Sequence, residues 1–98
     1  KNPVIPNEQF DQLKKLYPHL QGYKENEKYT KIAAAWLIEQ SGWKGYRKND
    51  AGCHNKQALV LVNYGNATGK EIFDLSTAII DDVKTKFSIT LQREVNII

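Results

Sequence analysis

Few side chains in this sequence have the type and spacing that enzyme chemistry requires. Cys53 stands next to His54, a pairing that can activate a thiolate, but adjacent residues on an extended segment point to opposite sides, and no third orienting group is evident. We therefore interpret Cys53 as a packed cysteine, since a free cysteine behaves as a small hydrophobic residue. His19 lies far from His54, so the sequence shows no zinc-ligand spacing and we predict no metal site.

Three further features could take part in binding or catalysis only if the fold places them beside a ligand. Residues 64–69 follow an apolar run and open a helix, as a phosphate-binding loop does, but they lack the Walker lysine–serine pair and the G-x-G-x-x-G pattern. A turn followed by a helix cap explains them equally well. Glu94 lies on the polar face of a predicted strand, where a carboxylate is either solvated or a site acid. Tyr23 and Tyr29 lie among charged residues, and their type alone favours neither ligand contact nor packing.

The elements of the first half follow from hydrophobic spacing and breaker residues. Residues 1–6 contain two prolines and predict an extended arm, and the apolar spacing over 7–17 predicts a helix that the next proline ends. The polar stretch 18–30 predicts one long exposed loop, a feature that is often functional in so small a domain. Thr30 is predicted to cap a largely buried helix, and Gly42 is predicted to end it.

The second half alternates strands with one long helix. A short strand is predicted near 46–48, and the apolar run 58–62 predicts a central strand buried on both faces. Thr68 and Glu71 have the spacing of a capping box in front of a long amphipathic helix. The alternation over 89–97 predicts a last, half-buried strand. This order indicates an α+β fold, a two-layer domain with a small, largely antiparallel or mixed sheet and helices packed on one face.

Composition limits what such a domain can do. The chain has 98 residues, of which 41% are hydrophobic and 26% charged, which suits a globular domain with one core. No apolar run reaches the ~18 residues of a membrane span, and the single cysteine excludes an internal disulfide, so we expect a cytoplasmic protein. The net charge of +3 with scattered lysines permits an anionic ligand without requiring nucleic acid. The start at Lys1 and the lack of methionine suggest a part of a longer protein.

A wider pattern extends over nearly the whole chain. It is carried by residues 34–40 (AAWLIEQ), 42–45 (GWKG), 50–54 (DAGCH), 56–63 (KQALVLVN) and 94–95 (EV), with Ile98 after them. In order and spacing these stretches resemble the C-terminal domain of the UDP-N-acetylenolpyruvoylglucosamine reductase (MurB) family. In that family NADPH, through a bound FAD, reduces the enolpyruvyl ether of a UDP-sugar to UDP-N-acetylmuramate for peptidoglycan.

The resemblance implies that residues 1–98 form a single domain, the C-terminal substrate-binding domain of a larger flavoenzyme. It implies FAD and NADPH as cofactors of the full-length enzyme, with neither bound by this part, because the FAD-binding domains lie outside this chain. The implied partners are the nucleotide-sugar substrate, UDP-N-acetylglucosamine enolpyruvate, and the FAD-binding domains of the same protein, with no nucleic acid and no membrane.

The resemblance also assigns roles to individual residues. Asn2 matches a position that contacts the substrate diphosphate, and an amide donor suits phosphate oxygens. Gln57 matches a substrate-binding glutamine. Tyr23 matches a tyrosine on a mobile loop that closes over the pyrophosphate, with Tyr29 as the alternative. Glu94 matches the catalytic glutamate, which acts with an arginine of the FAD domain around the substrate carboxylate. The proton-donating serine of the family would lie just before the first residue of this chain.

Two positions depart from the family pattern. Arg93 stands where the family usually has a proline before the glutamate, and Asn96 stands where it usually has an arginine, so a cation that orients its neighbours is lost. The alternative function is a non-enzymatic binding module for an anionic ligand such as single-stranded RNA, which scattered lysines and tyrosines permit. Against this alternative, the sequence has no RNP-like aromatic strand and no GXXG loop.

Overall fold

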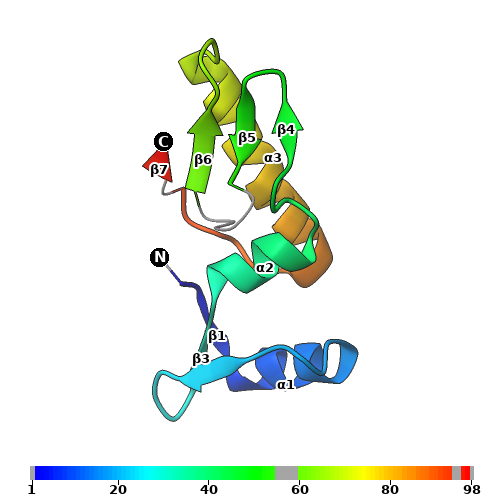
Figure 1. Ribbon diagram of the computed structural model, residues 1–98. Helices are drawn as coiled ribbons and strands as arrows, with labels where there is room; N and C mark the ends of the chain where they lie inside the picture. The colour runs from blue at the N-terminus through cyan, green and yellow to red at the C-terminus, as the bar shows by residue number, and fades with distance from the viewer. Residues whose placement is uncertain (1, 55–59, 94–95, 98) are drawn as a thin grey trace.

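The computed structural model describes residues 2–54, 60–93 and 96–97. Figure 1 shows these residues as two small sheets stacked end to end, with one helix beside each sheet and a third helix between them. The molecule is elongated, with extents of 46 × 21 × 21 Å. The predicted α+β class is confirmed, but its strands divide into two sheets where one was expected.

The first sheet contains three antiparallel strands in the order β1-β3-β2. They are β1 (Val4–Pro6), β2 (Gly22–Lys24) and β3 (Tyr29–Ile32). α1 (Asn7–Leu16) follows β1 directly and packs against β1 and β3. The predicted helix over 7–17 is therefore confirmed, and the predicted arm is the edge strand β1.

The second sheet has four strands within the described residues, in the order β4-β5-β6-β7. They are β4 (Arg47–Lys48), β5 (Ala51–Cys53), β6 (Val60–Asn63) and β7 (Asn96–Ile97). The pairs β4–β5 and β5–β6 are antiparallel, whereas β7 lies parallel to β6, so this sheet is mixed. α3 (Gly69–Phe87) runs behind the sheet in Figure 1 and contacts β5. α2 (Ala34–Gln40) joins the two parts and packs on α3.

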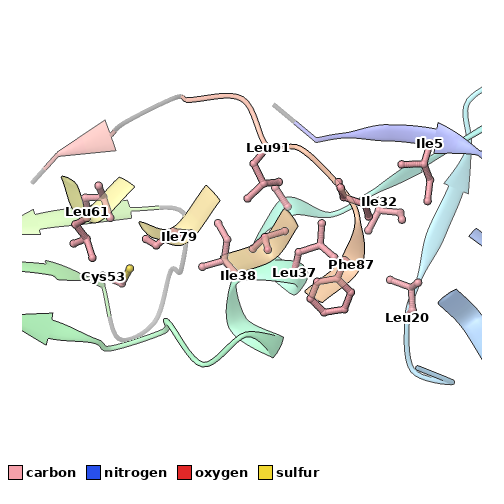
Figure 2. Close-up of a cluster of buried hydrophobic side chains, with 14 of the residues drawn as sticks. Ile5, Leu20, Ile32, Leu37, Ile38, Cys53, Leu61, Ile79, Phe87 and Leu91 are labelled. Carbon is pink, nitrogen blue, oxygen red and sulfur yellow. The ribbon is translucent and has the colours of Figure 1, made fainter. Parts of the chain in front are cut away.

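One continuous apolar core joins the two sheets through the helices. Figure 2 shows its side chains extending from Leu20 and Ile32 in the first part to Cys53 and Leu61 in the second. Three aromatic rings, each from the region of a different helix, meet pairwise with centroids 5.0–6.0 Å apart: Tyr17, Trp36 and Phe87. Such ring pairs contribute beyond the area that they bury, and here they hold the ends of the three helices together.

Two predictions for the first half are wrong. Residues 18–30 are not one exposed loop, because they contain β2 and the start of β3. Their polar composition wrongly indicated a loop, because one face of this sheet is exposed to solvent and carries polar residues. Thr30 does not cap a helix: it is buried within β3 and its hydroxyl donates to Asn7 Oδ1 at 2.7 Å. α2 begins four residues later, at Ala34.

The second half mixes confirmed and corrected predictions. β4 confirms the short strand near 46–48, and the capping box of Thr68 and Glu71 is formed. β5 was not predicted. Of the predicted strand 58–62, residues 58–59 lie outside the described residues, and the rest is not buried on both faces because Val62 is partly exposed. The last segment is not a strand over 89–93; only β7 pairs with a neighbour, and residues 94–95 lie outside the described residues.

Candidate functional site

One face of the first sheet is exposed to solvent and carries both tyrosines of interest. Tyr23 lies opposite Lys31, which in turn lies opposite Val4 on the other side of β3. Opposite residues share a face and alternate residues return to it, so Tyr29 lies on this face too. Tyr23 is 61% exposed, Tyr29 42% and Val4 44%. The sequence left open which tyrosine faces a ligand, and the register places both on one surface.

A short, well-formed turn connects the two strands that carry these tyrosines. Asn26 Oδ1 accepts the backbone N–H groups of Lys28 at 2.8 Å and Tyr29 at 3.1 Å, an Asx-type turn that the asparagine side chain itself makes possible. Lys31 Nζ lies 3.2 Å from Glu25 Oε2 across the hairpin. The face therefore presents two phenol rings beside a lysine. Such a surface can contact the sugar, base or phosphate groups of an anionic ligand.

Asn2 is exposed and is tied to the start of α2. Its Oδ1 accepts the backbone N–H of Ala34, the first residue of that helix, at 3.1 Å. This bond satisfies one of the N–H groups that a helix start leaves without a partner. It also orients the Nδ2 amino group, whose N–H groups are the donors that a phosphate oxygen accepts from. No sequence signal could have revealed this contact, because the two residues are 32 positions apart.

Gln57 and Glu94 lie outside the described residues, but the strands that follow them are described. β6 and β7 are parallel, with Val60 opposite Asn96. Gln57 precedes Val60 by three residues, and Glu94 precedes Asn96 by two. Parallel strands begin at the same end of a sheet, so β6 and β7 begin at one end of the second sheet.

Cys53 confirms the interpretation as a packed cysteine. Its side chain is fully buried and unpaired with another cysteine. Burial raises the pKa of the thiol to about 11, so the group is protonated and not nucleophilic at neutral pH. Within the described part of the chain, no group of three or more histidine, cysteine, aspartate or glutamate residues could hold a metal ion.

The glycine loop before α3 does not fit a phosphate or the diphosphate of a flavin. The backbone N–H groups of residues 65–67 donate to Asn63 Oδ1 and Asp50 Oδ2 at 2.9–3.1 Å. Thr68 Oγ1 accepts the Glu71 N–H, and Glu71 Oε1 accepts the Thr68 N–H, both at 3.1 Å. The donors that would cradle an anion are therefore engaged, and two carboxylates already lie there. The turn-and-cap interpretation of this loop is confirmed.

A cavity of about 300 Å³ lies between α3 and the β4–β5 hairpin. Trp43, Glu71 and Asp74 are among its lining residues, and Asn2 and Tyr23 are not. Two of its polar side chains have partners within the fold: Trp43 Nε1 donates to Asp82 at 2.8 Å, and Asp74 pairs with a lysine one turn away on α3 at 2.8 Å. Among the helices described, none is long and apolar enough to cross a membrane.

Comparison with known proteins gives a consistent result. The family model described as the C-terminal domain of UDP-N-acetylenolpyruvoylglucosamine reductase matches residues 1–98. Proteins named UDP-N-acetylenolpyruvoylglucosamine reductase are similar to the chain at 45% identity in Pseudomonas savastanoi pv. phaseolicola, 48% in Flavobacterium johnsoniae and 49% in Amoebophilus asiaticus. These matches cover 99–100% of the chain but only 29% of each relative. They do not support the alternative of an RNA-binding module.

Proposed function

Because the chain belongs to the family of UDP-N-acetylenolpyruvoylglucosamine reductases, through their C-terminal domain, we propose that it is the substrate-binding domain of a complete reductase. Residues 1–98 would act as one domain that binds UDP-N-acetylglucosamine enolpyruvate, the precursor of UDP-N-acetylmuramate in peptidoglycan synthesis. The observation that carries this proposal is the match of the family model over the entire chain. A cytoplasmic location agrees with the nucleotide-sugar substrate and with a single cysteine, Cys53, that forms no disulfide.

The redox cofactors belong, in this proposal, to the other domains of the complete enzyme. FAD and NADPH would be held there and would supply the hydride for the reduction. The glycine loop of this chain, the one place that resembled a phosphate site in the sequence, has its donors engaged within the fold. This chain would therefore contribute substrate contacts and a carboxylate.

Asn2 and the tyrosine face would bind the nucleotide end of the substrate. Asn2 offers amide N–H donors whose direction is set by the bond from Oδ1 to α2. Such donors can satisfy diphosphate oxygens. Tyr23 would close over the pyrophosphate from β2, with Tyr29 next to it on the same face. Covering the substrate in this way would exclude water from the reacting group.

Gln57 and Glu94 would make the remaining contacts with the substrate. Gln57 would bind substrate, and Glu94 would act with an arginine of the FAD domain around the substrate carboxylate while the enol intermediate is protonated. The parallel pairing of β6 with β7 supports a joint role, because the strands that follow these two residues in the sequence begin at one end of the sheet. A carboxylate in such a position would control proton transfer and charge at the reacting centre.

The test is Glu94→Gln in the complete enzyme, measured by NADPH oxidation with UDP-N-acetylglucosamine enolpyruvate. We expect kcat to fall by about 10²- to 10⁴-fold, the usual contribution of a positioned acid or base, with KM changed by less than about threefold. Glu8→Gln, on the exposed start of α1, is the matched control and should keep full activity. If the complete wild-type protein does not oxidise NADPH with this substrate, the proposed function fails. If only Glu94→Gln is silent, the role of Glu94 fails.

A further inference from the structure

Arg93 is fixed onto α3 by three contacts made by one side chain. Its Nη1 donates to Ser76 Oγ and, at 3.4 Å, to the backbone carbonyl of Phe73. Its guanidinium carbon lies 4.0 Å from the centre of the Phe73 ring. Ser76 is buried and donates its own hydroxyl proton to the same Phe73 carbonyl at 2.7 Å. Arg93, Ser76 and Phe73 thus form one connected unit, which we call the arginine clasp.

The clasp is the last of a series of anchors along the segment that follows α3. α3 ends at Phe87, and the next residue, Ser88, has the left-handed φ of 57° with which the chain leaves the helix. Leu91 is buried in the core, and Figure 2 shows its side chain directed among the core residues. After Arg93, the next described anchor is the pairing of Asn96 with β6. In the sequence, Glu94 and Val95 are the only residues between the clasp and that pairing.

We propose that Arg93 is a positioning residue for the reductase reaction: by fixing the backbone to α3 immediately before Glu94, it limits where the Glu94 carboxylate can reach. This inference rests on the proposed function. The contacts favour arginine for a physical reason. A planar guanidinium can stack on a ring and donate hydrogen bonds from its edge at the same time, which a lysine ammonium cannot do.

The first test replaces Arg93 by methionine in the complete enzyme. A misplacement of about 1 Å can cost a reaction about a hundredfold, and β7 still restrains the segment from the other side. We therefore expect kcat to fall roughly tenfold, with KM within about twofold of wild type and an unchanged melting temperature. Arg47→Met is the matched control, because Arg47 also stacks on an exposed ring, that of Tyr64 at 3.8 Å. It should keep the wild-type kcat. Wild-type kcat in Arg93→Met would overturn the proposal, as would a loss seen only in KM or in melting temperature.

The second test asks whether Arg93 acts through Glu94 and through the clasp. The double variant Arg93→Met/Glu94→Gln should be no slower than Glu94→Gln alone, because the residue that is positioned has already been removed. Phe73→Ala should reproduce the loss in kcat, and Phe73→Tyr, which keeps the ring, should restore activity. Additive losses in the double variant would overturn the proposal. If Glu94→Gln is itself silent, the role of Glu94 in the proposed function fails and the positioning role fails with it. A crippled Glu94→Gln with a silent Arg93→Met overturns the positioning role alone.

Discussion

The structure gives Asn2 one role, at the start of α2, and the proposed function gives it a second, at the substrate diphosphate; Asn2→Asp distinguishes the two. The aspartate keeps an oxygen at the position that accepts the Ala34 N–H at 3.1 Å, and its charge near a helix start is favourable by about 0.3–1 kcal/mol. The substitution removes the Nδ2 donor. A hydrogen bond to a charged phosphate contributes about 1.5–3 kcal/mol, and a carboxylate about 4 Å from a phosphate adds repulsion of about 4 kcal/mol at an effective dielectric of 20. Since 1.4 kcal/mol is about tenfold, KM should rise at least about a hundredfold.

The assay combines steady-state NADPH oxidation with thermal melting of the complete enzyme. Asn2→Asp should raise KM without lowering the melting temperature. Asn2→Ala should do both, because losing a helix-start acceptor costs about 1 kcal/mol, which corresponds to a few degrees. An unchanged KM in Asn2→Asp would refute the diphosphate role. A fall in melting temperature in Asn2→Asp as large as that in Asn2→Ala would refute the role of Oδ1 at the start of α2.

Three further predictions test the fold around the site. Cys53 is buried and its pKa is raised to about 11, so thiol reagents should label it only after denaturant is added; rapid labelling of the folded protein would contradict its burial. Thr68→Ala should destabilise the protein by about 1 kcal/mol, whereas Thr68→Ser keeps the Glu71 N–H acceptor and should be near neutral; equal losses in urea unfolding would rule out the capping box. The Lys86 hydrogen bond lowers the pKa of Asp82, so its stabilisation is present above the unfolded value of about 3.9 and is lost as pH falls through the folded value. The difference in the free energy of unfolding between wild type and Asp82→Asn should therefore become smaller below about pH 4. A difference that does not change with pH would exclude the Asp82–Lys86 pair as its cause.

Elements defined by local interactions could be predicted from the sequence. α3 is the best case, because its capping box spans four consecutive residues and its apolar residues recur at helical spacing. The glycine loop before it was interpreted correctly for the same reason: Asn63, Thr68 and Glu71 provide acceptors within a few positions of the donors. The buried Cys53 followed from chemistry alone, since neither a disulfide partner nor an orienting group was present in the sequence.

Features that depend on contacts between distant residues could not be predicted. Thr30 has the residue type of a helix cap, but its hydroxyl donates a hydrogen bond to Asn7. The backbone N–H of Ala34, the first residue of α2, is instead accepted by Asn2, 32 positions earlier in the sequence. The residues of the β2–β3 hairpin are mostly polar because one face of their sheet is exposed to solvent. The alternation of apolar and polar residues that indicates a strand was therefore weak there. Over 89–93, alternating burial was correctly detected, but it arises from a coil packed on the core. Burial with a period of two does not require a strand partner.

Asn2 and Glu94, two of the proposed site residues, lie near opposite ends of the sequence, and the side chains of Asn2 and Arg93 attach the chain there to a helix. Asn2 is bonded to the start of α2, and Arg93 is bonded to the middle of α3. The two helices pack on each other, so they can hold the two ends in a fixed relation without a direct contact between those ends. The resemblance noted in the sequence implies a proline at the position of Arg93, and the same reasoning offers a physical account of the exchange. A proline restrains the backbone through its ring, whereas Arg93 restrains it through Ser76 and Phe73. If so, the cost of changing Arg93 depends on those two helix residues, and Arg93 cannot be exchanged independently of them.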